Sequence, residues 1–143
     1  MTFLVQREVA DRVAATPGSS AYGALSVGVQ ASASVERVFR VAAGTFTPPP
    51  QVESAVIRLR PVAMPLVPDD AVGSFRRLVV GLFGFRRKQL LRALRELTGW
   101  PADRCAEALH RAGLDPVVRP ETLTPAAFAA LYRAVVDGGW SSD

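Results

Sequence analysis

The 143-residue sequence has one cysteine, Cys105, and one histidine, His110. A single cysteine excludes a disulfide framework and a zinc site built from several thiolates, so we expect a protein of the reducing cytoplasm. Both residues fall in one predicted helix, where Cys105 is expected to be a small core residue. His110 has no Asp or Cys at metal-ligand spacing, which favours a surface or partly buried histidine over a catalytic one.

Long apolar runs and phosphate-binding loops are missing as well. No stretch of about 18 residues is uninterruptedly apolar, so we expect no membrane span. The first residues lack the basic leader and the apolar core of a signal peptide. No GxGxxG pattern occurs, and the carboxylates are scattered. We therefore expect no catalytic centre, no metal site and no cofactor site in this chain alone.

Acidic residues are absent from one long segment. Between Arg76 and Arg95 lie seven of the 17 basic residues and no Asp or Glu, although the net charge of the chain is only +4. Such local basicity favours a polyanionic partner, with nucleic acid as the first candidate, and the alternative is a solvated helix face. The seven residues are Arg76, Arg77, Arg86, Arg87, Lys88, Arg92 and Arg95.

The first sixty residues have a mixed α/β pattern. Strand formers occupy residues 2–6, a helical pattern covers 7–15, and a second helix of small residues covers 23–33. Further strands are predicted at 35–41 and 54–59. A strand followed by a helix suggests the parallel part of an α/β sheet. Because a small isolated sheet is marginally stable, we expect this one to need neighbours that the sequence does not contain.

The remaining sequence is helical and follows a stiff linker rich in proline. We divide the chain into an incomplete sheet domain at 1–61, the linker at 62–68 and a helical domain at 69–143. The predicted helices run from a cap at Asp69 or Asp70 to Phe83, along 90–97, from Pro101 to Gly113, and from a cap at Thr124 to Gly138, with Phe128, Leu131 and Val135 as the core stripe of the last.

Phe46 stands before a run of three prolines, at positions 48–50. Proline fixes φ and lowers the conformational entropy of the free loop, so it holds its neighbours in place. An aromatic ring on so stiff a loop suits stacking on a flat ligand, such as a base taken out of its helix. The residues alone favour the other interpretation, in which Phe46 is a hydrophobic plug at the edge of the sheet.

Arg86, Arg87 and Lys88 follow two phenylalanines, at what the pattern indicates is the start of a helix. Cations are unfavourable there because the N-terminal end of a helix already carries partial positive charge. A sequence that accepts this cost often binds an anion with those side chains and the free backbone N–H groups. Phosphate contact and a solvated basic turn remain equal alternatives at this point.

Four segments in order resemble the KsgA-type small-subunit rRNA adenine dimethyltransferases. They are 5–12 (VQREVADR), 17–27 (PGSSAYGALSV), 46–59 (FTPPPQVESAVIRL) and 86–88 (RRK). The resemblance implies an α/β fold, namely the C-terminal part of a Rossmann-like methyltransferase sheet followed by a small all-α domain. The whole family enzyme transfers methyl groups from S-adenosylmethionine to N6 of two adjacent adenines near the 3′ end of small-subunit rRNA.

The resemblance also implies site residues and partners. Phe46, Pro48 and Pro50 would border the target-adenine pocket, and Arg86, Arg87, Lys88 and Arg92 would contact RNA. The implied partner is the rRNA of the small ribosomal subunit, and the intact enzyme would be a cytoplasmic monomer with neither a metal nor a membrane attachment.

This sequence departs from the family pattern in three ways. It contains no asparagine, so the family's Asn-Leu-Pro-Tyr motif is absent, as are its cofactor loop and ribose-binding acid. Arg92 replaces an asparagine of the family, and Ala24 replaces an arginine. We therefore expect a C-terminal fragment that needs S-adenosylmethionine only as part of the complete enzyme and is inactive alone. The alternatives are a non-catalytic module that binds rRNA or the small subunit, and a fragment of a related large-subunit rRNA methyltransferase.

Overall fold

The computed structural model describes residues 1–42 and 53–142. Their order is strand, two helices, two strands and then helices, as the sequence predicts. The elements are β1 (Thr2–Gln6), α1 (Arg7–Val13), α2 (Ala24–Gln30), β2 (Ala33–Val41), β3 (Ser54–Pro61), the 3-10 turn η2 (Asp69–Ala71), α3 (Val72–Phe83), α4 (Leu90–Thr98), α5 (Ala102–Ala112), the 3-10 turn η3 (Pro120–Thr122) and α6 (Pro125–Asp137). In the described part of the chain, no helix combines the length and the apolar character needed to cross a membrane.

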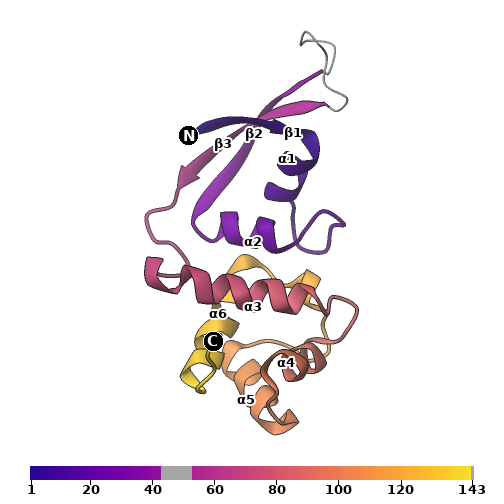
Figure 1. Ribbon diagram of the computed structural model, residues 1–143, viewed down its shortest axis with the longest axis vertical. Helices are drawn as coiled ribbons and strands as arrows, with labels where there is room; N and C mark the ends of the chain where they lie inside the picture. The colour runs from indigo at the N-terminus through magenta and orange to yellow at the C-terminus, as the bar shows by residue number, and fades with distance from the viewer. Residues whose placement is uncertain (43–52, 143) are drawn as a thin grey trace.

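The three strands form one sheet in the order β1-β3-β2 (Figure 1). Both outer strands are antiparallel to β3, with Ile57 opposite Phe3 on one side and opposite Arg37 on the other. The expectation of parallel pairing was therefore wrong for the strands that touch. The strand-helix-strand pattern behind this expectation is nevertheless present, because β1 and β2 run in the same direction and α1 and α2 connect them. The central strand β3 inserts between them and separates this parallel pair.

A small core lies between the sheet and α1. Ala10 and Val13 of α1 pack against Ala55 and Ile57 of β3, and all four are at most 5% exposed. The buried residues of β3 alternate with more exposed ones, as expected for a strand that packs on one face. The sheet therefore has one face covered by α1, within the residues described.

A larger core fills the helical part and extends into the first sixty residues. Tyr22 and Val27 belong to the same buried cluster as Leu78, Leu94 and Phe128. Figure 1 shows α2 lying between the sheet and α3. The linker is fastened to the end of α2, since the Val62 and Leu66 amides donate to the Ser32 and Ala31 carbonyls at 3.0 and 2.9 Å. The division into domains stays a prediction, but the packing of α2 joins the two parts.

The last helix forms as predicted. Thr124 caps α6, its hydroxyl accepting from the Ala127 amide at 3.0 Å, and Pro125 occupies the first turn. The predicted stripe of Phe128, Leu131 and Val135 is fully buried. Cys105 is buried as expected, and His110 is exposed on α5.

Two local predictions about helix starts were wrong. Asp69 and Asp70 do not cap α3; they form the turn η2, closed by the Ala71 amide on the Pro68 carbonyl at 2.9 Å, and α3 begins only at Val72. Arg86, Arg87 and Lys88 precede a helix instead of beginning one. Turns closed by Phe85 on Leu82 and by Lys88 on Phe85 redirect the chain, and extended Gln89 then starts α4.

Candidate functional site

Phe46, Pro48 and Pro50 lie outside the described residues, so their predicted place at a base pocket stays a prediction. The structure does fix where this loop leaves the sheet. Val41 pairs with Ser54 across β2 and β3. On the other side, the Arg7 amide donates to the Glu53 carbonyl at 2.9 Å, and the Arg7 guanidinium pairs with the Glu53 carboxylate at 3.2 Å. The end of the loop is thereby tied to the start of α1.

Arg86 turns toward the rest of the protein. Its guanidinium donates to the Tyr22 carbonyl at 3.2 Å, pairs with Glu121 at 3.3 Å, and lies 5.7 Å from the centre of the Phe83 ring. Tyr22 and Glu121 belong to segments far apart in the sequence. Arg86 therefore links the turn before α2 to η3, a role that the sequence did not reveal because neither partner is near it along the chain.

Lys88 and Arg92 share one carboxylate. The Lys88 ammonium pairs with Glu96 at 2.6 Å and sits 5.2 Å from the Phe85 ring centre, while Arg92 reaches the same oxygen at 4.0 Å. The hydrogen bond from Lys88, with help from the Arg92 charge, lowers the pKa of the Glu96 carboxyl. Glu96 therefore stays ionised and cancels one of the two positive charges beside it.

Arg87 is exposed and has no ion-pair partner within the described residues. Arg92 is also largely exposed, at 72% of its side chain, and its single ion pair is long. The four cations predicted to bind RNA thus divide into two groups. Arg86 holds the fold together, whereas Arg87 and Arg92 are exposed and Lys88 is partly exposed and paired with Glu96. Lys88 and Arg92 meet at Glu96, and Arg87 directly precedes Lys88 in the chain.

The structure also has a hollow beside Arg92 that the sequence did not predict. It measures about 550 Å³ and lies along the outer face of α4. Arg95, counted among the basic residues but not assigned to the site, lines it together with Arg92 and Trp100. The spacing of Arg92 and Arg95, three residues apart on a helix, was the available signal, because such residues share a face.

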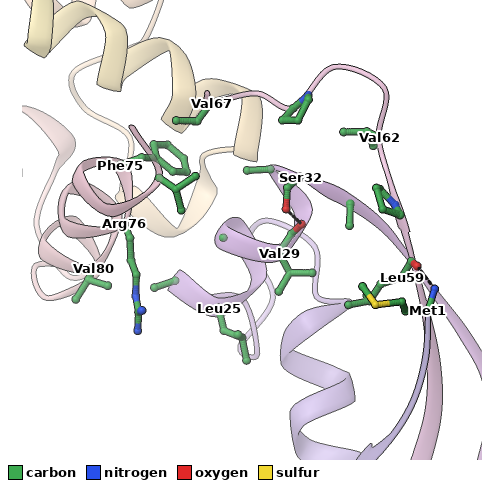
Figure 2. A pocket seen from close by; sticks show the side chains of 17 residues that line it. Met1, Leu25, Val29, Ser32, Leu59, Val62, Val67, Phe75, Arg76 and Val80 are labelled. Carbon is green, nitrogen blue, oxygen red and sulfur yellow. Dashed lines mark hydrogen bonds between the residues drawn. The ribbon is translucent and has the colours of Figure 1, made fainter. Parts of the chain in front are cut away.

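A second hollow, of about 710 Å³, is apolar and lies between α2, α3 and the edge of the sheet (Figure 2). Figure 2 shows Met1 and Leu59 at one side and Val80 with Arg76 at the other. Met1 and Leu59 exchange backbone hydrogen bonds of 2.8 Å in both directions. The start of the chain therefore lies in the wall of this apolar groove.

The edge of β1 adjoins the same region. Within the described residues β1 pairs with β3 alone, and its other edge has no strand beside it. Phe3 is 40% and Leu4 is 54% exposed on this strand. An apolar strand with a free edge is a template for pairing with further polypeptide.

Comparison with known proteins gives a consistent result. The family model described as ribosomal RNA adenine dimethylase matches residues 1–135. Ribosomal RNA small subunit methyltransferase A of Acidithiobacillus ferrooxidans is 45% identical over 139 residues, which are 97% of this chain and 50% of the relative. The chain thus spans about half the length of the curated relatives it matches.

Two solved structures share the fold. A dimethyladenosine transferase from Plasmodium falciparum superposes with a TM-score of 0.83 at 22% identity, over 96% of this chain and 57% of that one. The 23S rRNA methyltransferase ErmE gives a TM-score of 0.64 at 25% identity, over 94% of this chain and 54% of that one. The α/β fold expected from the motifs is therefore that of rRNA dimethyltransferases.

The motif resemblance, the family model and the sequence relatives agree over nearly the whole sequence, and the chain belongs to the ribosomal RNA adenine dimethylase family.

Proposed function

We propose that this chain is the C-terminal portion of a small-subunit rRNA adenine dimethyltransferase and supplies RNA binding to methyl transfer from S-adenosylmethionine. The observation that carries the assignment to part of a family enzyme is the family match over residues 1–135, combined with coverage of only half of the relatives. The order of the four motifs, at 5–12, 17–27, 46–59 and 86–88, supports the C-terminal part. The target would be two adjacent adenines near the 3′ end of small-subunit rRNA, and the setting the cytoplasm.

The free edge of β1 and the apolar groove support the assignment to one portion of a longer fold. Exposed Leu4 and the Met1 wall of the groove are apolar surfaces that a complete methyltransferase sheet would cover. The remaining length of the relatives is enough polypeptide to do so. In this proposal the sheet is completed by that polypeptide, whether it is joined to this chain or supplied separately.

The residues of this chain do not fit a cofactor site. The sequence has no glycine-rich loop of the dinucleotide-binding type and no asparagine for the family's adenine-holding motif. S-adenosylmethionine is therefore assigned to the complete enzyme, and this chain is expected to be inactive alone. Phe46, Pro48 and Pro50 are proposed to border the target adenine once the site is complete.

Arg87, Lys88 and Arg92 are the proposed RNA contacts within the helical part. Arg87 and Arg92 are exposed, and Arg87 has no ion-pair partner among the described residues. Lys88 is partly exposed, and it shares the single Glu96 carboxylate with Arg92. Guanidinium and ammonium groups bind phosphate in a manner that weakens with salt, because binding releases counterions. Arg86 is proposed to hold this turn in position.

The experiment measures binding of the chain to small ribosomal subunits that lack the two methylated adenines, together with methyl transfer from labelled S-adenosylmethionine. We expect salt-sensitive binding without methyl transfer. The double variant Arg87→Gln with Lys88→Gln should weaken binding several-fold, whereas Arg111→Gln with Arg133→Gln, an equal loss of charge at exposed positions elsewhere, should not. Methyl transfer by the chain alone, or equal binding by both variants, would overturn the proposal.

A second candidate function is a non-catalytic module that binds the small ribosomal subunit and takes no part in methyl transfer. The observation in its favour is that the helical part contains the larger core and most of the exposed cations. This candidate predicts binding of the same strength whether or not the remaining half of a family enzyme is present.

A further inference from the structure

We propose that the hollow along α4, lined by Arg92, Arg95 and Trp100, binds the backbone of small-subunit rRNA and extends the basic turn at 86–88 into one continuous RNA track. The inference rests on the proposed function, which supplies rRNA as the partner. To the proposed contact at Arg92 it adds Arg95 and Trp100, which neither the motifs nor the comparisons assign.

The charge of the hollow is positive and largely free. Arg92 and Arg95 both line it, and Arg95 has no ion-pair partner in the part of the chain that the structure describes. Glu96 is the one acidic residue of the lining, and the Lys88 ammonium already holds its carboxylate at 2.6 Å. An incoming phosphate would therefore meet two guanidinium groups without an unpaired carboxylate beside them.

Arg92 and Arg95 also have suitable spacing. Residues three apart on a helix share a face and are separated by about 4.5 Å along its axis. Lys88 lies before the start of α4, and its ammonium holds the same Glu96 carboxylate as Arg92. Arg92 and Arg95 therefore form a short row on the helix, with a third cation beside it. Such a row follows a phosphodiester backbone, and the guanidinium geometry matches phosphate oxygens through paired hydrogen bonds.

The start of α4 is not the anion site. Its first two amides are already satisfied, since Leu90 donates to the Val118 carbonyl at 2.6 Å and Leu91 donates to the Pro116 carbonyl at 3.0 Å. The attraction for phosphate must then come from the side chains in the hollow. This places the proposed contact along the helix and distinguishes it from anion binding at a helix end.

Trp100 gives the hollow an apolar wall in a fixed position. The Arg104 guanidinium lies 3.8 Å from the centre of its ring, and the Arg104 side chain is anchored on the Gly138 carbonyl. Trp100 is partly exposed where it borders the hollow. Single-stranded RNA is commonly bound by an aromatic ring beside arginines, because bases and riboses pack on the ring while phosphates meet the charges. This combination favours RNA over an acidic protein as the occupant.

The test compares the double variant Arg92→Gln with Arg95→Gln against the control Arg111→Gln with Arg133→Gln. The probe is a fluorescent transcript of the 3′ region of small-subunit rRNA, titrated at several salt concentrations. We expect several-fold weaker binding and a slope of log affinity against log salt that is shallower by about 1.5, since each phosphate contact contributes roughly 0.7–0.9. The control should change neither quantity.

A second measurement follows Trp100 directly. With Trp140 replaced by Phe, Trp100 is the one tryptophan left, and its emission should change on saturation with the transcript. Unchanged emission, or equal slopes for the two double variants, would overturn the inference. Weaker binding to whole subunits but not to the transcript would assign the hollow to a ribosomal protein and overturn it as well.

The two proposals fail in different ways. If the unsubstituted chain binds neither the transcript nor small subunits, the proposed function itself fails. The other outcome is that the double variant of Arg87 and Lys88 weakens binding, whereas the double variant of Arg92 and Arg95 binds as the control does. In that case only the assignment of the hollow is wrong.

Discussion

Tyr22 lies in the turn before α2, and its side chain is buried in the core that it shares with the helical part. Its hydroxyl donates to the Leu123 carbonyl at 2.6 Å, and its ring meets Phe83 edge-on at 5.9 Å between centres. Burial raises the pKa of Tyr22 to about 12. The phenol therefore stays protonated in the folded protein at pH values where an exposed tyrosine ionises.

This pKa predicts a loss of stability at high pH. In the unfolded chain Tyr22 ionises near its ordinary pKa of about 10, so above that pH the unfolded state binds fewer protons and gains stability relative to the folded state. The free energy of unfolding should be constant below about pH 10 with respect to this group and fall by up to ~2 kcal/mol toward pH 12. Urea denaturation at a series of pH values measures it. Tyr22→Phe should remove the fall while Tyr132→Phe keeps it; an identical profile for Tyr22→Phe would contradict the assignment.

Arg86 and Arg87 are neighbours in the chain, but we expect their substitution to affect stability very differently. Arg86→Ala removes contacts to Tyr22 and Glu121 and should lower the free energy of unfolding by about 1 kcal/mol, a value reduced because the side chain is 42% exposed. Arg87→Ala should change stability by less than about 0.5 kcal/mol, because it makes no ion pair with the described residues. Chemical denaturation of both variants measures these two changes in the free energy of unfolding. Equal losses of stability would mean that Arg86 is not the link between the two parts.

At the scale of elements, α6 offers the cleanest energetic test. Thr124→Ala removes the side-chain acceptor of the Ala127 amide and should cost about 1 kcal/mol of stability, whereas Thr124→Ser keeps the oxygen and should cost little. Thermal or urea unfolding measures the difference. A loss of the same size in Thr124→Ser would show that the methyl group, and not the cap, stabilises the helix.

The elements that the sequence predicted well are those with local causes. Thr124, Pro125 and the buried stripe of α6 act within a few residues of one another, so their pattern is sufficient. The antiparallel position of β3 was missed because strand pairing depends on residues that are far apart in the chain. The turn at 86–88 was taken for a helix start because its closing hydrogen bonds, from Phe85 and Lys88, leave no sequence signature.

The same distinction applies to the site. Arg87, Lys88 and Arg92 could be predicted from a run of cations without acids. The inward orientation of Arg86 could not, because it depends on Tyr22 and Glu121, which are 64 and 35 residues away in the numbering. The hollow beside Trp100 required the placement of α4 against the chain around Gly99 and is likewise a property of the folded protein.

At the scale of the whole molecule, we expect the edge of β1 that has no neighbouring strand among the described residues to promote self-association of the chain. Leu4 is 54% exposed on a strand with one neighbour among the described residues. Leu4→Lys should reduce self-association of the chain, because a charge on an edge strand opposes pairing between copies. Light scattering at matched concentrations measures this effect. If scattering is unchanged, the edge is not the surface through which copies associate.

The measurement that tests the central claim most directly is reconstitution. The chain is mixed with the part of the Acidithiobacillus ferrooxidans relative that it does not match, together with S-adenosylmethionine and unmethylated small subunits, and the two target adenines are analysed by mass spectrometry. We predict no methylation with either polypeptide alone and dimethylation of both adenines with the two together. Methylation by this chain alone would contradict the account, as would an inactive mixture in which the two polypeptides bind each other and the subunit.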